Sequence, residues 1–452
     1  MHVVETLAKF AEDLRTHPPA PEVLHHAKRA VVDWVAALLP GAVEPPATLL
    51  ERTLAGDLDR GSATLGTGRP ATARAAALIN GAAAHTVEVD DIFKDAIFHP
   101  GAPTIAAALA AAQELGADGA AFLRAMIAGY EISTRIGVAM GRTHYRYWHN
   151  TGTIGSFGAA AACAELYALD RRRFAHALAT VTTFAAGLQQ AFRMESMSKP
   201  LHAGRAAEAG LLAAQLAREG VTGSLDVIEG AAGFGRAMGD APDWSAALAT
   251  LGRDWHIARM TFKNHACCGH AFAAIDGALA LQRRLGVPHG DLARVTVGTY
   301  RTALEVAGAE NPTSAMAARF SLKYVVATAL VHGSVRLGAF DAARLDDPAT
   351  RALMSRIELT VDPEIDALFP QQRAARVTMT THDGRGESFL QPTRKGDPDA
   401  PLSDAELEEK FRELAGGVIG RAHADGMLAR LWTLDRSPDL MFLRDRAASL
   451  RK

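Results

Sequence analysis

An acidic segment with a histidine at its end is the first group of residues that could move a proton. Residues 85–103 read HTVEVDDIFKDAIFHPGAP and include Glu88, Asp90 and His99. Proline disfavours a helical conformation for the residue before it, so we expect His99 on extended or turning backbone. Histidine has a pKa of about 6.5, which suits it to proton transfer near neutral pH. Taken alone, the segment is more typical of a solvated acidic loop with a histidine at its edge.

A second histidine lies in a glycine-containing segment. Residues 145–158 read YRYWHNTGTIGSFG, in which His149 precedes glycines at every third position. That glycine spacing is typical of a helix packed closely on another helix. A phosphate-binding loop is not expected, because the segment lacks the GxGxxG pattern and a preceding strand.

The third segment, residues 196–204 (SMSKPLHAG), carries Lys199 and His202 before a long alanine-rich helix. A helix N-terminus favours anions through its unpaired amides and its dipole. Lys199 could therefore hold a carboxylate there, although an ordinary surface lysine is the alternative.

Residues 262–270 (FKNHACCGH) form the only cluster that resembles a metal site. Its candidate ligands are His265, Cys267, Cys268 and His270. Structural zinc sites usually combine a Cys-x-x-Cys pair with a second, distant pair, and this spacing is missing. We therefore expect no metal here.

A tyrosine lies on an otherwise apolar helix. The segment 320–324 (FSLKY) places Tyr324 within a stretch that is expected to be helical from 315 to 332. A buried tyrosine whose hydroxyl is paired is common, so this position alone indicates little about function.

The elements that must position these residues are mostly helices. In 22–39 apolar residues recur at spacings of three and four, which predicts a helix with one buried face. Comparable segments are 70–85, 103–115, 118–140, 152–166, 172–190 and 202–219. We expect residues 1–265 to form the first part of a large all-helical domain.

The pattern changes after residue 265. Segments 292–300, 356–361 and 376–381 alternate apolar or β-branched residues with polar ones, as half-buried strands do. Residues 382–386 (HDGRG) are typical of a hairpin connection. With helices at 268–285 and 315–332, residues 266–400 are expected to form a smaller α+β domain with an antiparallel sheet.

The C-terminal residues 401–452 are expected to return to the helical domain. Ser403 and Glu406 form a capping-box pattern at a helix start, and helical character continues through 418–450. The predicted fold class is therefore mainly α, with an inserted α/β lid domain.

Composition excludes several classes of protein. The 452 residues include 48 Lys and Arg against 50 Asp and Glu, so no basic excess indicates a nucleic-acid partner. Three cysteines cannot form a disulfide framework. The first residues lack a signal-peptide pattern, and no apolar stretch reaches the length of a membrane span. We expect a cytoplasmic protein that binds neither nucleic acid nor membrane.

The order of the motifs resembles the MmgE/PrpD family, which includes 2-methylcitrate dehydratase, cis-aconitate decarboxylase and iminodisuccinate epimerase. The matching motifs are HTVEVDD, HPGAP, WHNTGTIGSFGAAAA, SKPLHAGRAAEAG, AGFGRAM, KNHACCGHAFAAID, FSLKYVVA and the C-terminal stretch at 394–411. The resemblance implies a helical domain, a smaller α/β lid with a cleft between them, and usually a homodimer. It also implies no organic cofactor and, in general, no metal.

The acidic motif of the family reads approximately His-x-x-Asp-Phe-Asp-Asp-Thr. His85, Asp90 and Asp91 match it, whereas Glu88, Val89 and Ile92 replace the family's residues. Glu88 and Ile92 change size and polarity in the expected pocket, so the resemblance does not identify the substrate.

The resemblance also implies a set of site residues. Its members here are His99, His149, Lys199, Tyr324 and Lys263. We assign proton transfer to the two histidines, because a lysine would need its pKa lowered by about three units, roughly 4 kcal/mol, to compete at neutral pH. The two lysines would neutralise substrate charge, and Tyr324 would donate a hydrogen bond.

Orientation and substrate binding are the supporting roles in this scheme. Glu88 or Asp90 would orient an imidazole or a substrate hydroxyl. Asp90, His202 and Lys263 would help to bind the substrate.

Four functions remain open from the sequence. The one that we expect is a hydro-lyase that removes water from a small hydroxy-polycarboxylate such as a 2-methylcitrate-like acid, and the other three are alternatives to it. An epimerase or isomerase of a small dicarboxylate would need the same proton abstraction, and a decarboxylase is the third possibility. The last is a ligand-binding protein without catalytic activity.

Overall fold

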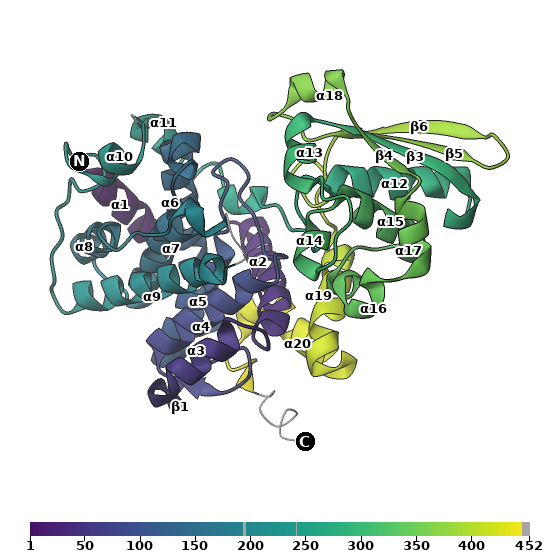
Figure 1. Cartoon of the computed structure of the whole chain (residues 1–452). Coiled ribbons are helices and arrows are strands. Elements are labelled where there is room, and N and C mark those ends of the chain that lie inside the picture. The colour runs from purple at the N-terminus through teal and green to yellow at the C-terminus, as the bar shows by residue number, and fades with distance from the viewer. Residues whose placement is uncertain (193–195, 241, 445–452) are drawn as a thin grey trace. The chain divides into compact units, whose positions relative to one another are not determined.

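The computed structural model describes residues 1–192, 196–240 and 242–444, and its secondary structure is mainly helical (Figure 1). The chain divides into two compact units. The first comprises Met1–Thr261 with Ser403–Lys452, and the second comprises Phe262–Leu402. The predicted class, mainly α with a smaller α+β part, is confirmed. That residues 1–265 and 401–452 form the helical domain and residues 266–400 the lid domain stays a prediction.

The first unit consists of helices and one small β-ribbon. Its elements are α1 Val3–Thr16, α2 Pro21–Gly41, α3 Ala47–Thr53, β1 Leu58–Thr64, β2 Pro70–Ala71, α4 Ala73–Thr86, α5 Gly101–Leu115, α6 Gly119–Tyr145, α7 Asn150–Leu166, α8 Arg171–Thr182, α9 Ser198–Arg218, α10 Phe234–Met238, α11 Trp244–Leu248, α19 Asp404–Ile419 and α20 Arg421–Trp432. Helices α4, α5, α7 and α9 pack against one another and form the core that carries the candidate site.

Small residues allow these helices to approach closely. A Cβ added at Gly81 in α4 would lie 2.9 Å from the Cα of Gly204 in α9. A Cβ at Gly155 in α7 would lie 2.5 Å from the ring of Pro103 in α5. These distances confirm that the glycine spacing of 152–158 serves helix packing.

Helix α19 packs on α2 and contacts the start of the acidic loop that joins α4 to α5. The Lys410 ammonium lies 2.6 Å from Asp33 Oδ1 and donates a 2.7 Å hydrogen bond to the carbonyl of Val89. All three groups are buried. The capping box of Ser403 and Glu406 at the start of α19 is confirmed.

The second unit contains a four-stranded sheet. Its elements are α12 Phe272–Leu285, β3 Leu292–Thr299, α13 Arg301–Ala307, α14 Ala315–Arg319, α15 Leu322–His332, α16 Ala342–Leu345, α17 Pro348–Met354, β4 Ile357–Val361, α18 Pro363–Leu368, β5 Ala375–Thr381 and β6 Gly386–Gln391. The strand order is β4-β3-β5-β6, and α12 packs on β5 and β6.

The expectation of an antiparallel sheet is right for β3, β5 and β6 and wrong for β4. Val295 pairs with Ile357 in a parallel ladder, whereas β5 joins β6 through the expected hairpin. Parallel neighbours need a long crossover, and the helices between β3 and β4 provide it.

Several predicted boundaries differ from the structure. The helix expected at 315–332 is two helices, the one expected at 172–190 ends at Thr182, and α9 begins before Lys199. The helix expected through 418–450 ends at Trp432, and its last predicted residues lie outside the described part of the chain. Across the residues that the structure describes, no helix combines the length and the apolar character that crossing a bilayer requires.

Candidate active site

The acidic loop between α4 and α5 is anchored along its length. Ile92 forms a β-bridge with Thr261, and Phe93 forms one with Phe98. Glu88 has a φ of 61°, a left-handed conformation that is uncommon for a residue with a side chain. Together with the bond from Lys410 to the loop backbone, these contacts give the loop a defined path.

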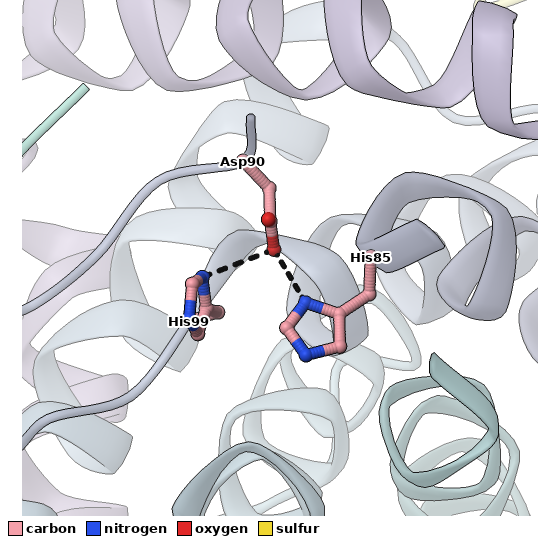
Figure 2. Close-up of side chains that lie close together, drawn as sticks. All are labelled: His85, Asp90 and His99. Atoms are coloured by element: carbon pink, nitrogen blue, oxygen red, sulfur yellow. Dashed lines mark hydrogen bonds and ion pairs between the residues drawn. The ribbon is translucent and has the colours of Figure 1, made fainter. Parts of the chain in front are cut away.

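Asp90 joins two histidines from the two ends of this loop (Figure 2). Its Oδ2 lies 2.7 Å from His85 Nδ1 and 3.2 Å from His99 Nδ1. His85 is the penultimate residue of α4, and His99 precedes Pro100 and α5 on irregular backbone, as predicted. Asp90 and His85 are fully buried, whereas 14% of the His99 side chain is exposed.

The charge on Asp90 determines which ring nitrogen of His85 and of His99 carries a hydrogen. Burial acts to raise the pKa of Asp90, but His99 and His85 outweigh it and hold that pKa well below its ordinary value. An ionised carboxylate has only acceptor oxygens, so the two Nδ1 atoms that face it carry hydrogens. In its neutral form each ring therefore has its lone pair on Nε2, which can act as a base. When either ring is protonated, the negative charge of Asp90 stabilises the imidazolium.

His149 and His202 form a second imidazole pair. His149 is the N-cap of α7, where its amide donates a 2.9 Å hydrogen bond to the Gly187 carbonyl. Its Nδ1 lies 3.0 Å from Nδ1 of His202, in the first turns of α9. One of these nitrogens must donate and the other accept, so the tautomers of the two rings are coupled.

The His149 pair lies beside the Asp90 group. The His149 ring stacks against that of His85, with centroids 5.5 Å apart and an interplanar angle of 20°. Burial, followed by His85, Lys199 and other nearby cationic groups, lowers the pKa of His149 well below 6.5. Burial also lowers the pKa of His202. His149 is therefore neutral at pH 7.

Lys199 completes the group in the first unit. Its ammonium forms an ion pair with Glu88, and it lies 5.5 Å from the centre of the Phe192 ring. Both charged side chains are partly exposed. Of the two carboxylates considered for orienting an imidazole, Asp90 contacts the rings and Glu88 contacts the lysine.

Asp91 belongs to a separate buried contact. It accepts a 2.8 Å hydrogen bond from the Tyr130 hydroxyl and a 3.0 Å bond from the Gly101 amide at the start of α5. Burial and the nearby charge of Asp33 raise its pKa to about 8. Asp91 therefore holds a proton at neutral pH and positions the helix start.

The remaining predicted site residues lie in the second unit. Tyr324 is buried on α15, and its hydroxyl donates a 2.5 Å hydrogen bond to the Ala339 carbonyl. Lys263 is buried, with 5% of its surface exposed. Their assigned roles stay predictions, as do those of the residues in the first unit.

The histidines of the metal-like segment 262–270 have separate partners. His265 Nε2 lies 2.9 Å from Asp276, and His270 Nδ1 lies 2.7 Å from the Tyr300 hydroxyl. Among the described residues, the group that could hold a metal ion is instead His85, Asp90 and His99, whose ligand atoms lie within 4.8 Å of one another. The same distances suit a hydrogen-bonded imidazole–carboxylate–imidazole group, so metal independence stays a prediction.

His85 is the residue that the sequence-based site omits. It matches the acidic motif, but no role is assigned to it from the sequence. The signal available in the sequence was its place at the end of an alanine-rich helix, five residues before Asp90.

Comparisons with known proteins cover nearly the whole chain. The MmgE/PrpD N-terminal domain model matches residues 5–247, and the C-terminal domain model matches residues 265–434. The chain is 29% identical to the cis-aconitate decarboxylase-like protein oryM of Aspergillus oryzae, over 97% of this chain and 96% of that protein. It is 26% identical to cis-aconitate decarboxylase of Aspergillus terreus, over 97% and 94%.

A human relative matches over a smaller part of the chain. Human cis-aconitate decarboxylase is 26% identical over 81% of this chain and 78% of that protein. Because the two domain models together span most of the residues, the chain belongs to the MmgE/PrpD family.

Proposed function

We propose that this protein is a lyase that acts on a small polycarboxylate by transferring a proton at a carbon beside a carboxylate. The observation that carries the proposal is the ionised, buried Asp90, whose Oδ2 faces the Nδ1 atoms of His85 and His99. A carboxylate behind an imidazole fixes its tautomer and stabilises the imidazolium, which is what a general acid or base requires.

Other residues of the first unit would accept a proton and bind the substrate. His149, neutral because of its lowered pKa, would accept a proton or a hydrogen bond. Lys199 would bind a substrate carboxylate, and its pairing with Glu88 limits how much negative charge it attracts. Lys263 and Tyr324 are the candidates from the second unit, and they rest on the family resemblance.

Among lyase reactions, we propose decarboxylation of a cis-aconitate-like acid first, because the relatives are named for it. In such a β,γ-unsaturated acid the bond to the departing carboxylate breaks and its electron pair forms a new double bond. The former alkene carbon then takes one proton. His99, as an imidazolium stabilised by Asp90, would supply that proton, and carbon dioxide would leave.

Dehydration of a hydroxy-polycarboxylate is the second candidate. It needs a base for the carbon-bound proton and an acid for the leaving hydroxyl, and the two imidazole groups would provide both. Epimerisation would use the same groups without net loss of water or carbon dioxide.

Proton NMR in deuterated water distinguishes these reactions. Wild-type protein is incubated separately with cis-aconitate, with 2-methylcitrate and with a chiral dicarboxylate. Carbon dioxide release with one deuterium in the product supports decarboxylation, and a new alkene signal from 2-methylcitrate supports dehydration. Exchange without net product supports epimerisation, and no change with any acid contradicts the proposal.

We also propose that the protein works as a homodimer without a metal or organic cofactor. Light scattering after gel filtration measures the mass, and elemental analysis with activity after chelation tests the metal. A monomer, or an activity abolished by chelation and restored by a divalent ion at the Asp90 group, would contradict this part.

A further inference from the structure

His85 is a fully buried histidine with only one satisfied ring nitrogen. Its Nδ1 is bonded to Asp90, and no exposed surface remains on the side chain. Among residues 1–192, 196–240 and 242–444, no protein atom is a hydrogen-bond partner for its Nε2. Buried polar atoms in native proteins nearly always have a partner, so a bound ligand or a water molecule is the expected partner of this nitrogen.

The chemistry of that nitrogen follows from Asp90. The ionised carboxylate fixes the hydrogen of His85 on Nδ1, so Nε2 has a lone pair when the ring is neutral and a hydrogen when it is protonated. Figure 2 shows Nε2 on the side of the ring opposite to the carboxylate. It can accept a hydrogen bond from a hydroxyl or donate one to a carboxylate.

The ring lies among the groups that we assign to proton transfer. Its centroid is 4.7 Å from that of His99 and 5.5 Å from that of His149. By contrast, both ring nitrogens of the buried His144 have partners within the chain: its Nδ1 lies 2.8 Å from the carbonyl of Met238, and its Nε2 lies 2.7 Å from a threonine hydroxyl.

We propose that His85 is a third histidine of the active site and that its Nε2 forms a hydrogen bond with the bound polycarboxylate. This inference rests on the proposed function and adds to it.

Binding of an unreactive acid tests the inference without turnover. Tricarballylate, a saturated tricarboxylate, is titrated into wild type, His85→Phe and His85→Gln by calorimetry. His176→Phe is the matched control, because His176 is also a buried helical histidine, and its Nδ1 contacts the Gly223 carbonyl. We expect tricarballylate binding to weaken about tenfold or more in the His85 variants, since a hydrogen bond to a charged group is lost, and to change less than about twofold in the control.

A spectroscopic readout on the wild type covers the case in which both variants fail to fold. In protein labelled with 15N-histidine, we expect one Nε2 signal of the lone-pair type to move toward the N–H type when tricarballylate binds, with its Nδ1 signal unchanged. If folded His85 variants bind tricarballylate as tightly as wild type, or if no Nε2 signal moves on binding, this inference is wrong and the proposed function still stands. A wild type that neither binds nor converts tricarballylate, citrate or cis-aconitate would overturn the proposed function as well.

Discussion

Replacing Asp90 by asparagine removes the charge behind two imidazoles and keeps the size of the side chain. In the wild type this carboxylate is ionised and lies 3.2 Å from Nδ1 of His99. The neutral amide can still accept a hydrogen bond, but it cannot stabilise an imidazolium to the same extent. We expect the pKa of His99 to fall in Asp90→Asn.

The size of the expected fall in the pKa of His99 follows from its distance to Asp90. Two unit charges 3.2 Å apart attract each other by about 5 kcal/mol at an effective dielectric constant of about 20. The imidazolium charge is spread over two nitrogens and His99 is partly hydrated, so we take half of this value. About 2.5 kcal/mol corresponds to nearly two pH units in the pKa of His99 and to a loss of roughly 100-fold in rate.

The assay is the pH dependence of kcat/KM on the acid that the wild type converts, measured from pH 5 to 9. In Asp90→Asn the limb of the kcat/KM profile that reports the pKa of His99 should move to lower pH, and kcat/KM at pH 7 should fall. Asp91→Asn is the matched control, because Asp91 is neutral at pH 7 and contacts Tyr130 and Gly101. A folded Asp90→Asn protein with unmoved limbs and a rate within threefold of wild type would refute the reasoning.

Four further predictions concern positioning and stability. His202→Ala removes the Nδ1 partner of His149, so steady-state kinetics should show kcat about tenfold lower at a similar KM; a raised KM at unchanged kcat would instead support the substrate-binding role. The raised pKa of Asp91 means that wild type loses stability as pH rises from about 4 to 8, whereas Asp91→Asn should not, and urea unfolding at pH 5 and 8 measures the difference. Lys410→Met breaks a buried ion pair and should lower the free energy of unfolding by about 3–5 kcal/mol; an unchanged urea midpoint would contradict this. Gly155→Ala forces a methyl group against a proline ring 2.5 Å away and should lower the free energy of unfolding by about 1–3 kcal/mol. A higher free energy of unfolding would show that the helices can separate freely.

The helical part of the fold followed from periodicity where a helix buries one face, as α12 does, whereas α7 is buried on all sides. Most predicted helices overlap the observed ones, and the change of pattern after residue 265 marks the second unit. The parallel pairing of β3 with β4 was missed, because alternation along a strand indicates a buried face and not the direction of its neighbour.

The motifs identified candidate residues but not the contacts between them. The motifs singled out His99, His149 and Lys199, and the structure places all three in the first unit. That Glu88 pairs with Lys199 while Asp90 holds the histidines depends on the left-handed turn at Glu88, which side-chain type and spacing did not predict. The stacking of the His85 ring on the His149 ring likewise depends on how the helices that carry them are placed.

The most direct test of the account is deuterium transfer to carbon. Wild type, His99→Ala and His149→Ala, each shown to be folded, are mixed with cis-aconitate in deuterated water, and deuterium in the product is followed by NMR. We predict incorporation of one deuterium by wild type and a rate about 100-fold or more lower in each variant, as expected when a positioned proton donor or its partner is lost. Full wild-type rates in both folded variants would contradict the assignment of proton transfer to this histidine cluster.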